Sequence, residues 1–209
     1  MPARPVPSPA PERAAARREQ IRAAAAECFC RHGFHGTSIA QISKAAGMSV
    51  GHIYHYFENK EAIIAEIVAQ DLERLLNLNL ELRSAHDVKD AIIERTAESV
   101  EGNLDPAVAG LKLEIIAEAA RNPSVAEAVR SADRQCRESL AKTVRDVRRA
   151  QGHEDADAVI AGMVEVLAAM FQGLLIRSVR NPELDKRMVV RMFRRVIRDL
   201  LMQAEDVAR

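Results

Sequence analysis

Apolar residues recur every three or four positions along most of the chain, the spacing that places them on one face of an α-helix. From Lys60 to about Leu82 they form one continuous stripe: Ile63, Ile64, Ile67, Val68, Leu72, Leu75 and Leu76. A second long stripe follows Asn122-Pro123 and continues to about Ala150. No segment shows the alternation expected of a strand. The pattern predicts an all-α fold of about nine helices.

Prolines, glycines and capping residues divide this pattern into elements. Five of the eight prolines fall in residues 1–11, which we expect to form a flexible tail. Gly33 is placed to end the first helix, and Gly47 permits a tight turn between two short helices. The predicted caps are Thr37 or Ser38, Ser49, Asn59 and Asp105. The helices then span about 11–32, 39–46, 50–56, 60–82, 86–102, 106–121, 123–150, 157–180 and a last segment after Pro182 to about 206.

Composition agrees with a helical protein. Aromatic residues make up only 3% of the chain and there is no Trp, which disfavours a β-sandwich or barrel. The formal net charge is zero, but its distribution is uneven. Residues 1–60 hold eight Lys/Arg against four Asp/Glu, while the remainder holds 22 against 26. A positive first segment on a negative body fits a phosphate-binding head joined to a separate domain.

The cysteines and the hydropathy pattern indicate a cytoplasmic protein. Cys28, Cys30 and Cys136 cannot all pair within one chain, and we expect reduced thiols. We expect no metal site and no cofactor, because no ligand set has suitable spacing and no phosphate-binding glycine loop occurs. No secretory signal is visible, and no uncharged run reaches the roughly 20 residues that a membrane span requires. We therefore predict no membrane partner.

Residues 37–57 carry the sharpest functional signal. Two short helices joined by a turn at Gly47 match a helix-turn-helix unit, which places its second helix in the DNA major groove. Such a pair cannot bury a core alone, so the preceding helix must supply Ile21 and Phe29 as a third wall. We predict a three-helix DNA-binding domain at 12–59 and a larger helical ligand-binding and dimerisation domain at 60–209.

The segment TSIAQISKAAGMSVGHIYHYFENKEAII (residues 37–64) resembles the DNA-binding signature of the TetR family of transcriptional regulators. Gly33-Phe34, the Ala-Gly-Met-Ser turn, Gly-x-x-Tyr and Tyr-Phe-x-x-Lys all fall in register, and the resemblance covers roughly residues 16–65. It implies that Thr37, Ser49, Tyr54 and Lys60 contact phosphates, with the Tyr54 ring able to touch a thymine methyl group. It also implies that Val50, Gly51 and His55 face bases. The full set of implied DNA contacts is Thr37, Ser38, Gln41, Ser49, Val50, Gly51, Tyr54, His55, Tyr56 and Lys60.

Two positions depart from the family pattern. Residue 50 is often long and polar in the family, whereas Val50 offers only apolar contacts, and residue 56 is commonly His where this chain has Tyr56. Ordinary alternatives also stand beside the DNA-binding interpretation. Phe57 is expected in the core, His55 is equally compatible with a plain surface imidazole, and Gln41 and Lys44 are solvated by default.

A ligand pocket is predicted among the helices between Asp105 and Phe171. Its candidate residues are Leu111, Glu114, Ile115, Glu118, Cys136, Met163, Leu167, Met170 and Phe171, although residues such as the apolar ones more often belong to a plain core than to a ligand site. Glu114 and Glu118 lie one turn apart. Facing inward they would suit a cationic ligand, and facing outward they would be solvated and pair with Arg121, which is the interpretation we favour.

The last two helices are predicted to form a homodimer interface. Apolar or small residues occur nearly all round residues 157–180, which predicts a helix buried on every side, and the final helix has one wide apolar stripe. In the TetR family this terminal pair forms a four-helix bundle with its twin; a monomeric core is the alternative. The predicted protein is a homodimeric repressor that a small molecule releases from a palindromic DNA operator. A helical ligand-binding or scaffold protein with a vestigial helix-turn-helix is the other candidate, and no enzyme motif supports catalysis.

Overall fold

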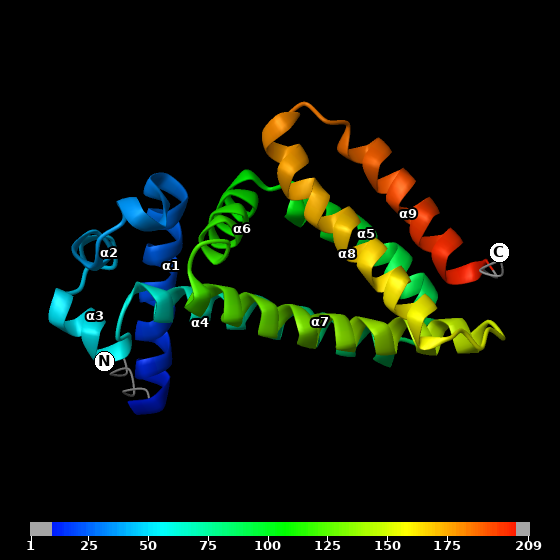
Figure 1. Ribbon diagram of the computed structural model, residues 1–209, viewed down its shortest axis with the longest axis horizontal. Helices are drawn as coiled ribbons and strands as arrows, with labels where there is room; N and C mark the ends of the chain where they lie inside the picture. Colours follow the sequence, from blue (N-terminus) through cyan, green and yellow to red (C-terminus); the bar gives the residue numbers. More distant parts are fainter. Residues whose placement is uncertain (1–9, 204–209) are drawn as a thin grey trace, which may run out of the picture.

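The structure is a computed structural model that describes residues 10–203. Within this range the chain forms nine helices and no strand (Figure 1), which confirms the predicted fold class. The helices are α1 (Ala10–Gly36), α2 (Ile39–Ala45), α3 (Val50–Tyr56), α4 (Lys60–Ser84), α5 (Val88–Asn103), α6 (Pro106–Ala119), α7 (Pro123–Ala150), α8 (Asp157–Arg180) and α9 (Lys186–Met202). Residues 1–9 of the predicted tail and the predicted end of the last helix near 206 lie outside the described residues.

Most of the predicted helix starts are found with their caps. Ser38, Ser49 and Asn59 each accept a hydrogen bond from the backbone N–H three residues later, and Asp105 caps the helix that Pro106 opens. Of the two residues proposed to cap α2, the structure therefore selects Ser38. Gly33 has φ +70°, a left-handed conformation that interrupts α1 where the sequence predicted its end. These local signals fix where the chain changes direction.

Helices α1, α2 and α3 form a head at one end of an elongated molecule (Figure 1). Their shared core contains Ile21, Phe29, Ile42, Ile53 and Phe57, all of which are almost inaccessible to solvent. The predicted core position of Phe57 is thus confirmed. The same cluster continues into the body through Ile63 and Ile64 of α4, Ile115 of α6 and Val125 of α7. The head is therefore packed directly against the helices that follow it.

The body is built from α4 to α9. The long helices α4 and α7 lie side by side, while α5, α8 and α9 form a second group, and α6 stands beside α1 (Figure 1). A second core cluster lies where α7, α8 and α9 meet and includes Val147, Ile160, Met163 and Ile197. A third joins Val100, Leu104 and Leu174. Helix α8 contributes to both of these clusters.

Within the single chain α8 is not buried on every side, and the expected burial against a second copy stays a prediction. Ile160, Met163, Val164 and Leu167 are buried, but Val166, Ile176 and Val179 are 46%, 48% and 65% exposed. A Cβ built on Gly162 or Gly173 would meet no atom within 4 Å, so these glycines also face open space. Among the described residues α8 is the one helix whose length and composition would allow it to cross a membrane. A core helix passes the same test, and α8 packs against α6, α7 and α5.

An ion cluster joins the head to α4. Glu66 of α4 receives hydrogen bonds from Arg18 and Arg22 of α1, and the Arg18 guanidinium also lies 4.6 Å from the centre of the Phe57 ring. The Arg18 hydrogen bond is the main reason why the pKa of Glu66 is lowered, with the charges of Arg18 and Arg22 adding to it against desolvation. The folded state therefore favours the ionised carboxylate.

We expect Glu66→Gln to lower the free energy of unfolding by about 1.5 kcal/mol at pH 7, because a charge-assisted hydrogen-bond pair is weakened. Since the folded pKa is depressed, this contribution is present above the unfolded carboxyl pKa of about 4.3 and is lost as the pH falls through the lower folded value. Urea unfolding from pH 7 to pH 3 should show the two proteins converging in acid. Glu73→Gln, at an exposed position of the same helix, is the matched control. A stability difference that stays constant down to pH 3 would contradict the assignment.

Candidate DNA-binding interface

Helix α3 separates an inner from an outer face. Ile53 is fully buried on the inner face, and the predicted base-facing residues Val50, Gly51, Tyr54 and His55 are all exposed. Tyr54 is 54% exposed and Val50 is 40% exposed. The residues expected to read bases are therefore brought together on one accessible surface. This arrangement is what insertion into a groove requires.

The neighbouring polar residues are partly engaged within the head. Ser38 and Gln41 form a capping box at the start of α2: Gln41 N–H donates to the Ser38 hydroxyl, and the Gln41 side-chain oxygen accepts from Ser38 N–H at 2.7 Å. Both residues are exposed. Tyr56 is half-buried, and its ring stacks on the His52 imidazole with centroids 5.4 Å apart. Ser38, Gln41, Ser49 and Tyr56 thus border the α3 surface, with Ser49 capping that helix.

Thr37 does not have the predicted geometry of a phosphate contact. Thr37 is 2% exposed, and its hydroxyl lies 2.8 Å from Gly33 O and 3.0 Å from Cys28 O, so its single proton donates to one of these two carbonyls or is shared between them. The hydroxyl therefore closes the end of α1 rather than facing solvent. The motif placed Thr37 correctly at the head of α2, but residue type alone did not show that α1 ends with carbonyl groups in need of a donor.

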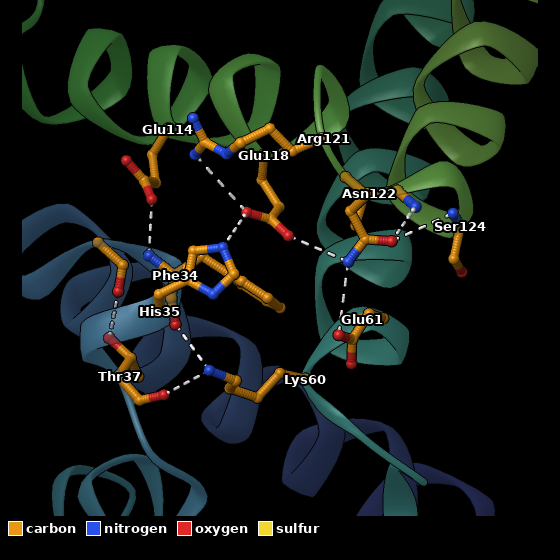
Figure 2. A network of polar contacts seen from close by, with 12 residues as sticks. Phe34, His35, Thr37, Lys60, Glu61, Glu114, Glu118, Arg121, Asn122 and Ser124 are labelled. Carbon is orange, nitrogen blue, oxygen red and sulfur yellow. Dashed lines mark hydrogen bonds and ion pairs between the residues drawn. The ribbon is translucent and has the colours of Figure 1, made fainter.

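Lys60 has a similar structural task (Figure 2). Its ammonium group donates to Phe34 O and Thr37 O, each at 2.7 Å, and lies 4.3 Å from the centre of the Phe34 ring. An ammonium has three protons, so two are occupied by the head's own backbone. In this conformation Lys60 ties the start of α4 to the turn between α1 and α2, and the expected phosphate contact stays a prediction.

Helix α6 holds the same turn from the opposite side. Glu114 Oε1 accepts a hydrogen bond from Phe34 N–H at 2.6 Å (Figure 2). The left-handed backbone of Gly33 directs this N–H away from α1, and a Cβ at residue 33 would lie 3.2 Å from the same carboxylate oxygen. The Glu114 carboxylate on α6 therefore binds an N–H group of this turn, while the Lys60 ammonium on α4 binds two of its carbonyl groups.

Glu118 lies one turn further along α6 and is 1% exposed. Asn122 donates to its Oε1 at 3.0 Å, the His35 imidazole lies 3.0 Å from Oε2, and Arg121 lies 3.8 Å away (Figure 2). The favoured expectation that Glu114 and Glu118 face solvent is wrong, although the predicted Arg121 pairing is present. Both carboxylates face inward, but they face the head and the start of α7 rather than a ligand.

The predicted pocket residues do not converge on one cavity. Leu111 and Ile115 pack into the core of the head, whereas Met163, Leu167 and Phe171 belong to the clusters around α8. A cleft of about 350 Å³ lies between the end of α4 and the middle of α5, and a small cavity of about 70 Å³ lies near the start of α9. None of the nine predicted pocket residues lines either one; Cys136 and Met170 are half-buried. For the apolar residues of this set, their apolar character predicted burial, but it did not predict which core cluster each would join.

The three cysteines are free thiols. Burial raises the pKa of each thiol, and neighbouring carboxylates raise it further: Glu27 acts on Cys28, Glu114 on Cys30, and Asp133 on Cys136. A raised pKa keeps a thiol protonated and weakly nucleophilic. Among the described residues no three His, Cys, Asp or Glu side chains are grouped as metal ligands.

Sequence reasoning did not identify the contacts that join head and body. His35 and Phe34 received no role beyond the motif, and the importance of Phe34 lies in its backbone N–H rather than in its side chain. The signal that was available is Gly33, whose left-handed turn exposes that N–H. Which distant side chain accepts from it is decided by the packing of α6 against α1, and periodicity within a single helix does not contain that information.

Comparison with known proteins gives a consistent result. Residues 21–67 match the model of bacterial regulatory proteins of the tetR family, and residues 90–202 match the C-terminal model of BetI-type transcriptional repressors. The transcriptional regulator UidR of Escherichia coli K12 is 33% identical over 162 residues, covering 76% of this chain and 79% of that protein.

Two solved structures show the same fold. Salmonella enterica GusR has a TM-score of 0.74 and 33% identity, with 89% of this chain and 95% of that chain covered. FadR from Bacillus subtilis, solved in complex with stearoyl-CoA, has a TM-score of 0.72 and 17% identity, covering 90% and 99%. At the latter identity the likeness concerns the fold alone.

We expect Glu114→Ala to loosen the turn at residues 33–37, because Phe34 N–H loses its acceptor. Deuterium exchange of the peptide that contains Phe34 should accelerate about tenfold, as expected for one lost hydrogen bond to a charged group. Glu101→Ala, at an exposed position of α5, is the control. Equal exchange in both variants and the wild type would show that the carboxylate does not hold the turn.

Proposed function

We propose that this chain, which belongs to the TetR family of bacterial regulatory proteins, acts as a cytoplasmic homodimer on a near-palindromic operator. The family match and the repressor relatives identify it as a ligand-responsive transcriptional repressor. The observation that carries the proposal is the division of α3 into a buried inner face and an outer face that presents Val50, Gly51, Tyr54 and His55. A helix-turn-helix whose second helix were covered by its own chain would be unable to enter a groove.

The proposed DNA interface centres on α3 and borders on α2. Tyr54 supplies a hydroxyl that can reach a phosphate, and the exposed Lys44 supplies a fixed positive charge close to the turn. Gln41 keeps its amide N–H₂ group for DNA because only its oxygen is used in the capping box. Lys60 and Thr37 support this surface from behind through the hydrogen bonds within the head.

The proposed dimer pairs α8 and α9 with the same helices of a second copy. Twelve large apolar side chains of the described chain are markedly exposed, and seven of them lie on these two helices: Val166, Ile176, Val179, Met188, Met192, Val196 and Met202. Gly162, Gly173 and the exposed Ala169 would let another helix approach closely. A concentrated apolar surface of this kind is typical of an interaction site rather than of free surface. Pairing in two copies would also place two α3 helices on successive grooves about 34–36 Å apart.

The proposed effector is a small molecule bound in the body, as the FadR–stearoyl-CoA complex illustrates for a protein of this fold. Its signal would pass to the head through α4 and α6. Lys60 on α4 and Glu114 on α6 hold the same turn of the head, so a shift of either helix relative to the other changes the position of α3. The two heads of the dimer would then no longer fit successive grooves. This is the proposed basis of release.

The proposal is tested by fluorescence-anisotropy titration of the full chain against DNA from upstream of its own gene, at salt concentrations from 50 to 200 mM. We expect binding tighter than to scrambled DNA, with log K falling linearly with log salt. Tyr54→Ala should weaken binding at least tenfold. Lys44→Ala should reduce the slope of the salt dependence by about one.

A thermal-shift screen of metabolites and drugs then identifies the effector, which must stabilise the fold and raise the Kd for DNA.

The outcome that contradicts this function is equal affinity for operator and scrambled DNA at every salt concentration. That result would favour a helical ligand-binding or scaffold protein with a vestigial helix-turn-helix. Leu80→Ala, at a 53% exposed position of α4, is the control for loss of exposed apolar area and should leave DNA affinity unchanged.

We expect Ala169→Glu to convert the protein to a monomer, because it places a charge in the middle of the proposed apolar interface. Operator affinity should fall at least about 100-fold, since the two heads no longer bind as one linked unit. Sedimentation equilibrium measures the oligomeric state and the same titration measures affinity. Ala69→Glu, on the exposed side of α4, introduces the same charge elsewhere and should alter neither quantity. A dimeric Ala169→Glu protein would refute this choice of interface.

A further inference from the structure

Helix α3 carries an exposed apolar surface that the head does not need for its own core. Ile53 and Phe57 of the same segment, together with Ile42 of α2, are 0–2% exposed and already close the interior. Val50 lies one helical turn before Tyr54, and the two are 40% and 54% exposed. In the part of the head that the structure describes, no other large apolar side chain is exposed to this degree.

Gly51 leaves the space next to Val50 open. A Cβ built on Gly51 would meet no atom within 4 Å, so the protein itself does not require glycine there for space. Its φ is not in the left-handed region either, because the glycines with positive φ among the described residues are Gly33, Gly47 and Gly152. A glycine inside a helix costs about 0.5–1 kcal/mol relative to alanine. A bare backbone on the outer face is therefore suited to close approach by another molecule.

The chemistry of the α3 surface limits what it can read. The segment 50–56 contains no Lys or Arg, so the common bidentate pairing with guanine is not available to this helix. At its start, the side chain of Val50 offers only methyl groups. On the edges of base pairs in the major groove, the one apolar group is the 5-methyl of thymine.

We propose that Val50 is a specificity-determining residue and packs against the 5-methyl group of a thymine in each operator half-site, with Gly51 allowing α3 to lie close enough for this contact. The inference rests on the proposed function, because it requires α3 to enter the major groove. It goes further in naming the base and the group that is read. One such thymine per half-site follows from the two-fold symmetry of the proposed dimer.

The test replaces thymines by deoxyuridine, one at a time, in the shortest duplex from upstream of the gene that retains full affinity. Deoxyuridine removes only the methyl group and keeps the O4 acceptor. We expect one thymine position, present once in each symmetry-related half-site, at which the replacement matters. There, each deoxyuridine should lower the affinity of the full-length wild-type protein about fourfold, the effect of one buried methyl group. With Val50→Ala the same replacement should have less than half that effect, because the partner methyl groups are gone.

A second variant separates DNA contact from folding. Gly51→Ala has room within the protein and favours the helix, so its melting temperature should stay the same or rise. Its operator affinity should nevertheless fall at least tenfold, because the added methyl group holds the helix away from the bases. Ala45→Gly, an exposed position at the end of α2, is a control for small changes in the same motif.

The outcomes are distinguishable. If operator binding is specific but every deoxyuridine duplex binds within a factor of two, the thymine contact is refuted while the proposed function stands. If the sensitive thymine is equally sensitive in Val50→Ala, the methyl group is read by another residue and the assignment to Val50 is refuted. If the protein shows no preference for any duplex, both this inference and the proposed function fail.

Discussion

The turn at residues 33–37 is held by two opposite charges, and the placement of the head depends on both. Peptide groups are dipoles, and here Phe34 N–H donates to the Glu114 carboxylate while the carbonyls of Phe34 and Thr37 accept from the Lys60 ammonium. Because one charge comes from α6 and the other from α4, the turn is fixed only while these two helices keep their relative position. The α3 surface follows the turn, since it is packed on α1 and α2 through one core.

Burial of Glu118 adds to the rigidity of this junction. A carboxylate that is 1% exposed loses its hydration, and that cost must be offset by partners close at hand. Asn122 comes from the turn between α6 and α7, and His35 from the end of α1, so the carboxylate joins three segments at one point. Asn122 also approaches Glu61 of α4 at 3.5 Å, which extends the network to a fourth segment. The head and body therefore meet through polar contacts laid over a shared apolar core.

The sequence predicts the fold well because helix periodicity and caps are local. Ser49, Asn59 and Asp105 act as caps in the structure as they do in the pattern, and Gly33 and Gly47 both have positive φ. The outer face of α3 was predictable for the same reason.

What the pattern did not contain is the partner of each side chain. Thr37 and Glu118 are polar, and polarity alone suggests that a side chain faces solvent or DNA. Thr37 is instead buried against the carbonyl groups of Gly33 and Cys28, and Glu118 is buried beside the imidazole of His35. Similarly, apolar residues all round α8 indicate that each of its faces needs a partner, but not which faces are covered within the single chain and which are exposed.

The charge of the head leads to a conclusion about affinity. The first 60 residues have an excess of four basic residues, but several of these cations are held by the protein itself: Arg18 and Arg22 bind Glu66, Arg31 pairs with Glu27, and Lys60 binds backbone carbonyls. Nonspecific attraction to DNA depends on the number of phosphates that cations can neutralise. We therefore expect a single head to bind DNA weakly, because α3 carries no Lys or Arg and several of the remaining cations already have partners within the protein. In the dimer proposed above, useful affinity would then come from two linked heads and from close contact with base edges, so that dimer geometry would control binding more strongly than in a highly basic head.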